Sequence, residues 1–210
     1  MKKIAVFASG AGTNATKIIE HFASPPTSRI AGTSSLHFVE KGDLKTPKIS
    51  VALIVSNKPE AGVLKIAAQK NITALILEKE KFFRGDAYIK ELKKTGIDFI
   101  VLAGFLWKIP PSLIKAFPAS IINIHPALLP KYGGIGMYGQ FVHQAVINNK
   151  EKESGITIHY VDEVYDHGHI IFQATCPVLS TDTADSLAKR VAALEHEYYP
   201  QVIEETVGKK

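Results

Sequence analysis

The sequence predicts a three-layer α/β fold, in which a Rossmann-like, mainly parallel sheet carries helices on both faces. Three observations predict it. Short apolar runs alternate with helical periodicity through the first part of the chain. A length of 210 residues suits one core rather than two, so we expect a single domain over 1–210. Two late strand patterns flank a polar turn, which predicts an antiparallel hairpin at one edge of the sheet.

Apolar runs mark the strands of the parallel part of the sheet. The run 99–103 is the most apolar, which predicts a central strand that is buried on both faces. Alternation of strands with helices implies right-handed crossovers between parallel neighbours. The five strands expected here cover 4–7, 51–55, 73–77, 99–103 and 119–124.

Helical spacing of apolar residues marks the segments between these strands. Ile18, Ile19 and Phe22 share one face of a helix over 14–22. Pro110 and Pro111 open a helix that ends at 117, because proline suits a first turn. The other helices expected in this part cover 61–69 and 86–94.

The last part of the chain is predicted to form the hairpin and a long helix. Strands over 155–161 and 170–178 are joined by polar residues. The final helix starts near 183, where Thr181 or Thr183 can cap it. Earlier in the chain, residues 24–48 contain three prolines and two glycines and are long for a connection, which predicts a surface loop.

Composition excludes several classes of function. Hydrophobic residues make up 46% of the chain and charged residues 21%, which is typical of an ordered globular protein. No apolar run in the sequence approaches the ~20 residues that a membrane helix needs, so we expect no membrane partner. The single cysteine, Cys176, rules out an internal disulfide and is consistent with a reducing, cytoplasmic location.

The net charge of +5 is consistent with binding of a small anion such as a phosphate. Lys and Arg are scattered along the sequence, without a long cluster and without interleaved aromatic residues. We therefore expect small-molecule substrates and no nucleic-acid partner.

A glycine-rich turn, Ser9-Gly10-Ala11-Gly12-Thr13-Asn14, joins the first strand to the first helix. Glycines let a backbone approach an anion closely, and the helix behind the turn offers free N–H groups and the positive end of its dipole. The pattern lacks the third glycine of a dinucleotide site and the Gly-Lys-Ser/Thr of a P-loop. We expect a phosphate site here, the alternative being a plain turn capped by Thr13 or Asn14.

Asn123 and His125 end an otherwise apolar strand. Because they are two residues apart, both side chains point to one side near the carboxyl edge of the sheet. An amide donor beside an imidazole can hold an oxyanion and move a proton, which makes this pair the candidate catalytic residues. The alternative is a structural asparagine and a hydrogen-bonded core histidine.

The loop 162–169 is acidic and contains two histidines. Its spacing matches no closed zinc pattern, and Cys176 has no cysteine partner in the sequence, so we expect no metal. A carboxylate from this loop beside His125 would fix the tautomer of the imidazole and raise its basicity. The alternative is a solvated hairpin turn.

Several segments, in order along the chain, share the pattern of a known family. The most specific is Asn123-Ile124-His125-Pro126-Ala127-Leu128-Leu129-Pro130-Lys131-Tyr132, and the others are 4–14, 55–59, 102–106, 155–159 and 166–168. Together they resemble the glycinamide ribonucleotide formyltransferases, a family of folate-dependent formyltransferases in purine synthesis. The resemblance covers nearly the whole chain and implies one formyltransferase domain over 1–210.

The resemblance implies 10-formyltetrahydrofolate as the formyl donor and co-substrate, and glycinamide ribonucleotide as the amine that accepts the formyl group. Asn123 and protonated His125 would stabilise the tetrahedral oxyanion. Asp166 would pair with His125 and assist proton transfer through water. The residues implied at the substrate phosphate and ribose are Gly12, Thr13, Asn14 and Glu195.

The same resemblance places the folate between the segment 102–106 and the loop 161–166. Trp107 stands where many relatives carry an arginine near the folate, and the segment 133–140 differs from relatives in length and residues. Arg84 lies near a position where relatives use a basic residue, which makes it a further possible substrate contact. The residues implied at the folate are Leu102, Phe105, Leu106, Trp107, Val161, Asp162 and Asp166.

Other interpretations of the sequence stay open. Relatives that formylate initiator methionyl-tRNA or hydrolyse formyltetrahydrofolate share the Asn-x-His pair and the late Asp, but they carry an additional domain that we do not expect in this chain. A non-catalytic sugar-phosphate-binding module would explain the glycine-rich turn but leave Asn123, His125 and Asp166 without a role. We expect a monomer or a weak homodimer.

Overall fold

The computed structural model describes residues 1–23 and 49–210, so the predicted loop 24–48 lies outside the described residues. Its centre is a seven-stranded sheet of order β3-β2-β1-β4-β5-β6-β7. The strands up to β5 pair in parallel, whereas β6 pairs antiparallel with both β5 and β7. The strand bounds are β1 (Lys2–Phe7), β2 (Ile49–Ser56), β3 (Thr73–Ile76), β4 (Phe99–Leu102), β5 (Ile121–His125), β6 (Glu153–Tyr160) and β7 (Ile170–Pro177).

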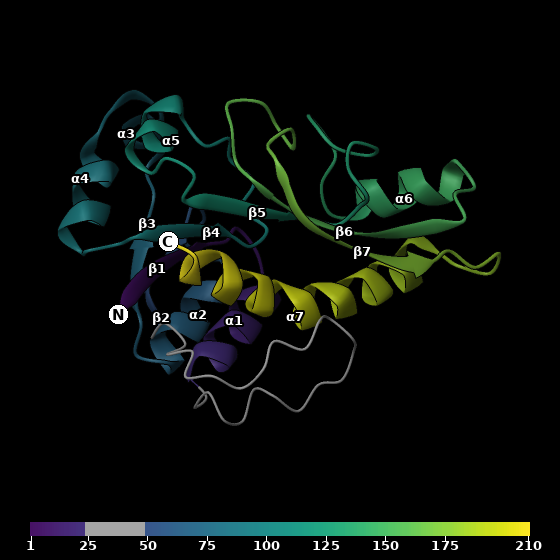
Figure 1. Ribbon diagram of the computed structural model, residues 1–210, viewed down its shortest axis with the longest axis horizontal. Helices are drawn as coiled ribbons and strands as arrows, with labels where there is room; N and C mark the ends of the chain where they lie inside the picture. The colour runs from purple at the N-terminus through teal and green to yellow at the C-terminus, as the bar shows by residue number, and fades with distance from the viewer. Residues whose placement is uncertain (24–48) are drawn as a thin grey trace.

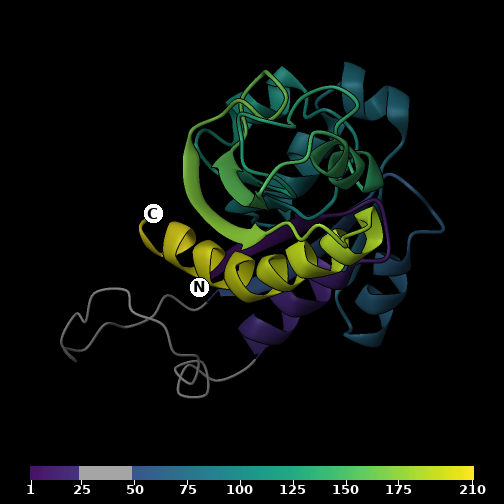
Figure 2. The same ribbon diagram turned by 90° about the vertical axis from the view of Figure 1, so that its right-hand side faces the viewer.

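This topology confirms the predicted fold class, including the antiparallel edge hairpin and the central place of the most apolar strand, β4. Helices cover both faces of the sheet (Figures 1 and 2). On one face lie α1 (Thr13–Ala23), α2 (Gly62–Gln69) and α7 (Ala184–Gly208), with α6 (Gln140–Asn148) packed against α7. On the other face lie α3 (Lys79–Arg84), α4 (Ala87–Lys94) and α5 (Pro111–Ala116).

Side chains alternate between two cores because strand residues point to opposite faces in turn. In β1, Ile4 and Val6 belong to the core under α1 and α7, whereas Ala5 and Phe7 belong to the core under α4 and α5. Strand β5 follows the same rule, with Ile122 and Ile124 in the first core and Ile121 in the second. Asn123 and His125 therefore point to the side of Ile121, as their spacing predicts.

Helix α7 is the longest described helix, with 25 residues, and it begins with a capping box. Thr183, one of the two predicted caps, accepts a hydrogen bond from the Ser186 N–H at 3.2 Å, and the Ser186 hydroxyl accepts one from the Thr183 N–H at 3.0 Å. Further along, the buried Tyr199 hydroxyl donates to the Leu102 carbonyl at 2.8 Å, which ties α7 to β4. No helix in the described ranges is long and apolar enough to cross a bilayer.

Candidate active site

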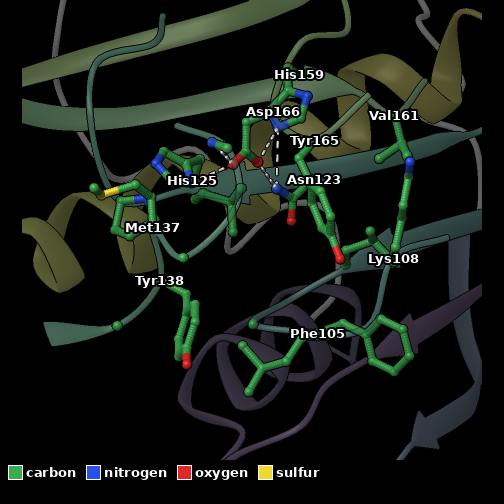
Figure 3. Close-up of a pocket in the computed structure, with 18 of the residues that line it drawn as sticks. Phe105, Lys108, Asn123, His125, Met137, Tyr138, His159, Val161, Tyr165 and Asp166 are labelled. Carbon is green, nitrogen blue, oxygen red and sulfur yellow. Dashed lines mark hydrogen bonds and ion pairs between the residues drawn. The ribbon is translucent and has the colours of Figure 1, made fainter. Parts of the chain in front are cut away.

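The carboxyl ends of β4 and β5 open into a pocket of about 640 Å³. Ligands of parallel α/β sheets bind at this edge, because neighbouring strands lead there into loops that diverge. Figure 3 shows the side chains that converge in the pocket, with Asp166 between His125 on one side and His159 on the other. The sequence-predicted residues that line it are Asn14, Leu102, Phe105, Leu106, Trp107, Asn123, His125, Val161, Asp162, Asp166 and Glu195.

Strand β5 supplies the amide and imidazole of the site. In the register between β5 and β6, Asn123 lies opposite His159 and His125 lies opposite Thr157. The Asn123 side-chain nitrogen lies 3.2 Å from His159 Nε2 and 3.5 Å from Asp166 Oδ1. Asn123 and His125 therefore reach one carboxylate, although the carboxylate lies on a loop far along the chain.

The loop between β6 and β7 carries Asp166 into the pocket through an unusual backbone turn. Asp166 has a φ of 54°, in the left-handed region that L-residues other than Asn and Asp rarely adopt. Two residues later, position 168 requires glycine, because a Cβ there would overlap the Tyr160 carbonyl oxygen. The Asp166 Oδ2 atom accepts a hydrogen bond from the Gly134 N–H at 2.9 Å, so a backbone group on a second loop helps to hold the carboxylate in place.

His159 is the residue of this centre for which the sequence suggested no role. Its Nδ1 lies 2.8 Å from the Tyr160 carbonyl oxygen, which can only accept, so Nδ1 carries the hydrogen. Its Nε2 atom faces both the Asn123 amide nitrogen at 3.2 Å and Asp166 Oδ1 at 3.6 Å, and in the neutral ring this nitrogen can accept from the Asn123 N–H₂. His159 thus fixes which way the Asn123 amide is turned. His159 ends the segment 155–159 of the family resemblance, but its contact with Asn123 depends on the strand register.

The protonation of His125 is set by opposing influences. Its Nε2 lies 2.7 Å from the Tyr132 carbonyl oxygen and therefore carries a hydrogen, while Nδ1 lies 3.6 Å from Asp166 Oδ2. Burial lowers the pKa of His125 below its ordinary value, and the Asp166 charge and the Tyr132 carbonyl only partly compensate. Negative charge on a nearby substrate oxygen would therefore favour the imidazolium form.

The Asp166 carboxyl is held as an anion. Burial raises its pKa, but His159, His125 and the Gly134 N–H outweigh burial and bring the pKa below its ordinary value. The carboxylate is thus charged at neutral pH although only 11% of its side chain is exposed. A buried anion beside two imidazoles is a suitable proton acceptor and a counter-charge for an imidazolium.

The glycine-rich turn reaches the pocket through Asn14, and its Ser9 hydroxyl accepts a hydrogen bond from the Leu106 N–H at 2.9 Å. Gly12 has a φ of 83°, and a Cβ there would lie 2.8 Å from the Val63 Cβ, so only glycine fits. Asn14 lines the pocket and donates from its amide nitrogen to Glu195 Oε2 at 2.8 Å. Its Oδ1 is buried without a hydrogen-bond partner among the described residues, and burial raises the pKa of Glu195. Gly12 and Thr13, at the start of α1, are not among the residues that line the pocket.

Aromatic side chains form one wall of the pocket. Phe105 and Trp107 have ring centroids 6.4 Å apart, and Phe82 from α3 lies 5.7 Å from Trp107. Lys108 approaches the Tyr165 ring at 5.7 Å on the same side (Figure 3). The glycine-rich segment around Met137 and Tyr138 lines the opposite side.

Two further predictions concern residues at the margin of this region. Arg84 is not brought to the pocket, because its side chain is 79% exposed on α3 and pairs with Glu80 at 3.0 Å. Asp162 lines the pocket and pairs with the exposed His167 at 2.9 Å. Across residues 1–23 and 49–210, no group of three or more His, Cys, Asp and Glu side chains is arranged to hold a metal ion.

Comparison with known proteins places the chain in a family. A family profile described as Formyl transferase matches residues 2–203. The chain is 40% identical to the chloroplastic phosphoribosylglycinamide formyltransferase of Arabidopsis thaliana, over 96% of this chain and 64% of that protein. It is 35% identical to the phosphoribosylglycinamide formyltransferase of Bacillus subtilis, over 99% of this chain and 96% of that protein.

Solved structures show the same relationship. The crystal structure of phosphoribosylglycinamide formyltransferase from Bacillus halodurans superposes with a TM-score of 0.80 at 32% identity, over 99% of this chain and 96% of that chain. The chain spans somewhat less than two thirds of the length of the plant relatives, 64% in Arabidopsis thaliana and 60% in Vigna unguiculata. The match to the family profile and to these relatives covers nearly all of the sequence, and the chain belongs to the formyl transferase family.

Proposed function

We propose that this chain transfers the formyl group of 10-formyltetrahydrofolate to the amine of glycinamide ribonucleotide. The observation that carries the proposal is that one pocket gathers three kinds of group. Asn14 and Glu195, the aromatic residues Phe105 and Trp107, and the centre of Asn123, His125 and Asp166 all line it. In this proposal a phosphoribosyl substrate contacts the first group, a flat folate ring contacts the second, and the reacting atoms lie at the third. The names of the relatives support the same assignment.

In this proposal the substrate amine attacks the formyl carbon and negative charge develops on the formyl oxygen. The Asn123 side-chain nitrogen has two hydrogens, and the one near Asp166 is engaged only at 3.5 Å, so it is free to donate to that oxygen. The His125 Nδ1 atom, 3.6 Å from Asp166, is the second donor when the imidazole is protonated. Preorganised donors of this kind act most strongly where water is excluded.

Asp166 completes the proposed reaction as a proton acceptor. The attacking nitrogen becomes positively charged and must lose a proton, while N10 of the folate gains one as the bond from carbon to N10 breaks. A water between the amine and Asp166 would carry the first proton, because the carboxylate is ionised and its Oδ2 is anchored by Gly134. Atoms and charge then balance without a covalent intermediate on the protein.

The proposed substrates are small molecules, glycinamide ribonucleotide and formyl-folate. A cytoplasmic location stays a prediction, and we infer it from the single cysteine alone. Hydrolysis of the formyl-folate and binding without turnover are the competing functions, and each makes a different prediction for one assay.

The test is to mix the purified chain with 10-formyltetrahydrofolate and follow the loss of the formyl group by the absorbance of the folate. We expect deformylation that depends on glycinamide ribonucleotide and yields the formylated amide in equal amount. A matched Asn123→Ala protein should bind both compounds but turn over far more slowly. Equal deformylation with and without the amine would identify a hydrolase, and binding of both compounds without turnover would identify a binding module.

A further inference from the structure

Tyr132 lies outside the pocket lining yet contacts the catalytic centre through its backbone. Its carbonyl oxygen accepts the hydrogen bond from His125 Nε2 at 2.7 Å. This carbonyl is directed by a backbone with a φ of 58°, in the left-handed region that a tyrosine rarely adopts. A residue in that region relaxes unless its surroundings hold it, and relaxation would rotate the carbonyl away from the imidazole.

The side chain of Tyr132 is fastened on the far side of this turn. Its hydroxyl donates to Glu151 Oε1 at 2.9 Å, and its ring packs against the core under α7. Glu151 follows α6 and precedes β6, with 25% of its side chain exposed. Lys131 pairs with the same carboxylate oxygen at 3.0 Å. The phenol is therefore held at both its ring and its hydroxyl while the backbone faces His125.

The same turn also supports the other half of the centre. Gly134 donates its N–H to Asp166 Oδ2, and a Cβ on Gly133 would lie 3.2 Å from the Asp166 Cβ and closer still to the Leu129 side chain. One short segment thus orients His125 from one side and Asp166 from the other. Its position depends on the anchor at Tyr132, because the glycines that follow provide little stiffness of their own.

We propose that Tyr132 and Glu151 are positioning residues, and that their phenol–carboxylate hydrogen bond holds the Tyr132 carbonyl on His125 Nε2. The kinetic consequence rests on the proposed formyl transfer, whereas the structural claim does not. The titratable groups that face His125 are Asp166 on the β6–β7 loop, His159 on β6 and His143 on α6. His159 and His143 lie outside this turn, whereas Asp166 is bonded to it through Gly134, so a change in His125 titration reports on the position of the turn.

Two variants, Tyr132→Phe and Glu151→Ala, each remove one partner of the phenol–carboxylate hydrogen bond. The protonation of the His125 ring is then followed by ¹⁵N NMR over a pH series. The carbonyl contact raises the pKa of His125, so both variants should titrate at lower pH than the native protein. We expect kcat/KM for formyl transfer to fall about tenfold to a hundredfold, because small misplacements at a reacting centre are costly. Lys131→Met removes the other partner of the same oxygen and should leave the titration and kcat/KM unchanged.

A double variant separates positioning from loss of stability. If the hydrogen bond is the shared cause, Tyr132→Phe with Glu151→Ala should shift the His125 titration no more than either single change. Additive shifts, or native titration of His125 in both folded single variants, would overturn the proposal. Glu151→Gln keeps an oxygen acceptor for the Tyr132 hydroxyl, so His125 should titrate in this variant as it does in the native protein. If Glu151 acted only through its charge or the stability of the fold, this variant would shift the titration as well. The NMR result is read on protein without substrate, so it stands even if the native chain fails to transfer formyl groups.

Discussion

Backbone carbonyls determine which nitrogen carries the hydrogen in the two imidazoles nearest to Asp166. The Tyr160 carbonyl holds the hydrogen on His159 Nδ1, and the Tyr132 carbonyl holds it on His125 Nε2. The remaining nitrogen of each ring therefore faces the interior of the site, toward Asn123 in one case and Asp166 in the other. The chemistry at the residue scale thus depends on main-chain geometry that side-chain identities do not reveal.

Glu195 offers a prediction for substrate recognition at the residue scale. Its carboxylate accepts from Asn14, and the unpaired Asn14 Oδ1 beside it can accept from a substrate hydroxyl. Glu195→Gln keeps the shape and the Asn14 contact but weakens any bond from a ribose hydroxyl. We expect KM for glycinamide ribonucleotide to rise about tenfold, because hydrogen bonds to charged groups contribute about 1.5–3 kcal/mol. KM for the formyl-folate should stay unchanged.

Steady-state kinetics with each substrate varied in turn measures this separation. Glu204→Gln is the matched control, since Glu204 lies on the same helix and pairs with His21 rather than lining the pocket. An equal rise in both KM values, or the same rise in the control, would show that Glu195 acts on the fold of α7 rather than on the phosphoribosyl substrate.

At the scale of elements, α7 joins several parts of the site. It supplies Glu195 to the pocket, binds the β4 carbonyl of Leu102 through Tyr199, and packs against α1 and α6. The start of α7 is fixed by the capping box and by the Arg190 pair with Asp182, in which Nη2 lies 2.9 Å from Oδ1. Stability of this helix should therefore depend on its first turn.

Removing the cap tests this dependence. Thr183→Ala loses the side-chain acceptor for the Ser186 N–H, and we expect the free energy of unfolding to fall by about 1 kcal/mol. Thr181→Ala, outside the capping box, should change it by less than about 0.5 kcal/mol. Urea unfolding of both variants measures the difference. Equal losses would show that the capping box does not determine where α7 begins.

Strong periodicity in the sequence predicted most elements of the fold. The strands and the helices α1, α2, α4, α5 and α7 have long apolar patterns or clear start signals, and each appears within a few residues of its expected place. Helices α3 and α6 were not predicted. Helix α3 has only six residues with adjacent aromatics, and α6 follows Gly139 at a φ of 53° without a side-chain cap. Both depend on tertiary packing rather than local signals.

The site could be predicted only where its signal is local. The spacing of Asn123 and His125 in one strand predicted that both project together, and they do. The partner carboxylate required the family resemblance, because several acidic residues share its loop. His159 and Tyr132 each end a segment of the family resemblance. The contact of His159 depends on a cross-strand register and that of the Tyr132 carbonyl on a backbone angle, so neither contact could be predicted. Arg84 rested on a loose match, and the structure places it on an exposed helix.

For the whole molecule, buried and partly buried histidines link the free energy of unfolding to pH. Burial lowers the pKa of His125, His143 and His196 below their ordinary value of 6.5. As pH falls through 6.5, the unfolded chain takes up protons that the folded chain does not, so the folded state loses stability. Each histidine contributes at most about 1.4 kcal/mol per pH unit in this window. Asp166, whose pKa is lowered from 3.8, adds a further loss only below about pH 4.

Denaturant unfolding between pH 8 and pH 5 measures this linkage. We expect these histidines to change the free energy of unfolding little above about pH 7. Below about pH 6.5 they should lower it steadily. His143→Gln should make the decrease shallower, and the matched change His169→Gln at an exposed position should not. A folded His143→Gln protein whose stability falls as steeply with pH as that of the native protein would contradict the contribution of this histidine.

The measurement that tests the catalytic assignment most directly is kcat for formyl transfer in Asn123→Ala and His125→Ala proteins, with both substrates saturating. We expect a loss of about 10²–10³ in kcat for each donor removed, with circular dichroism and unfolding midpoint close to native. A folded His125→Ala protein that transfers formyl groups at a near-native rate would contradict the catalytic assignment.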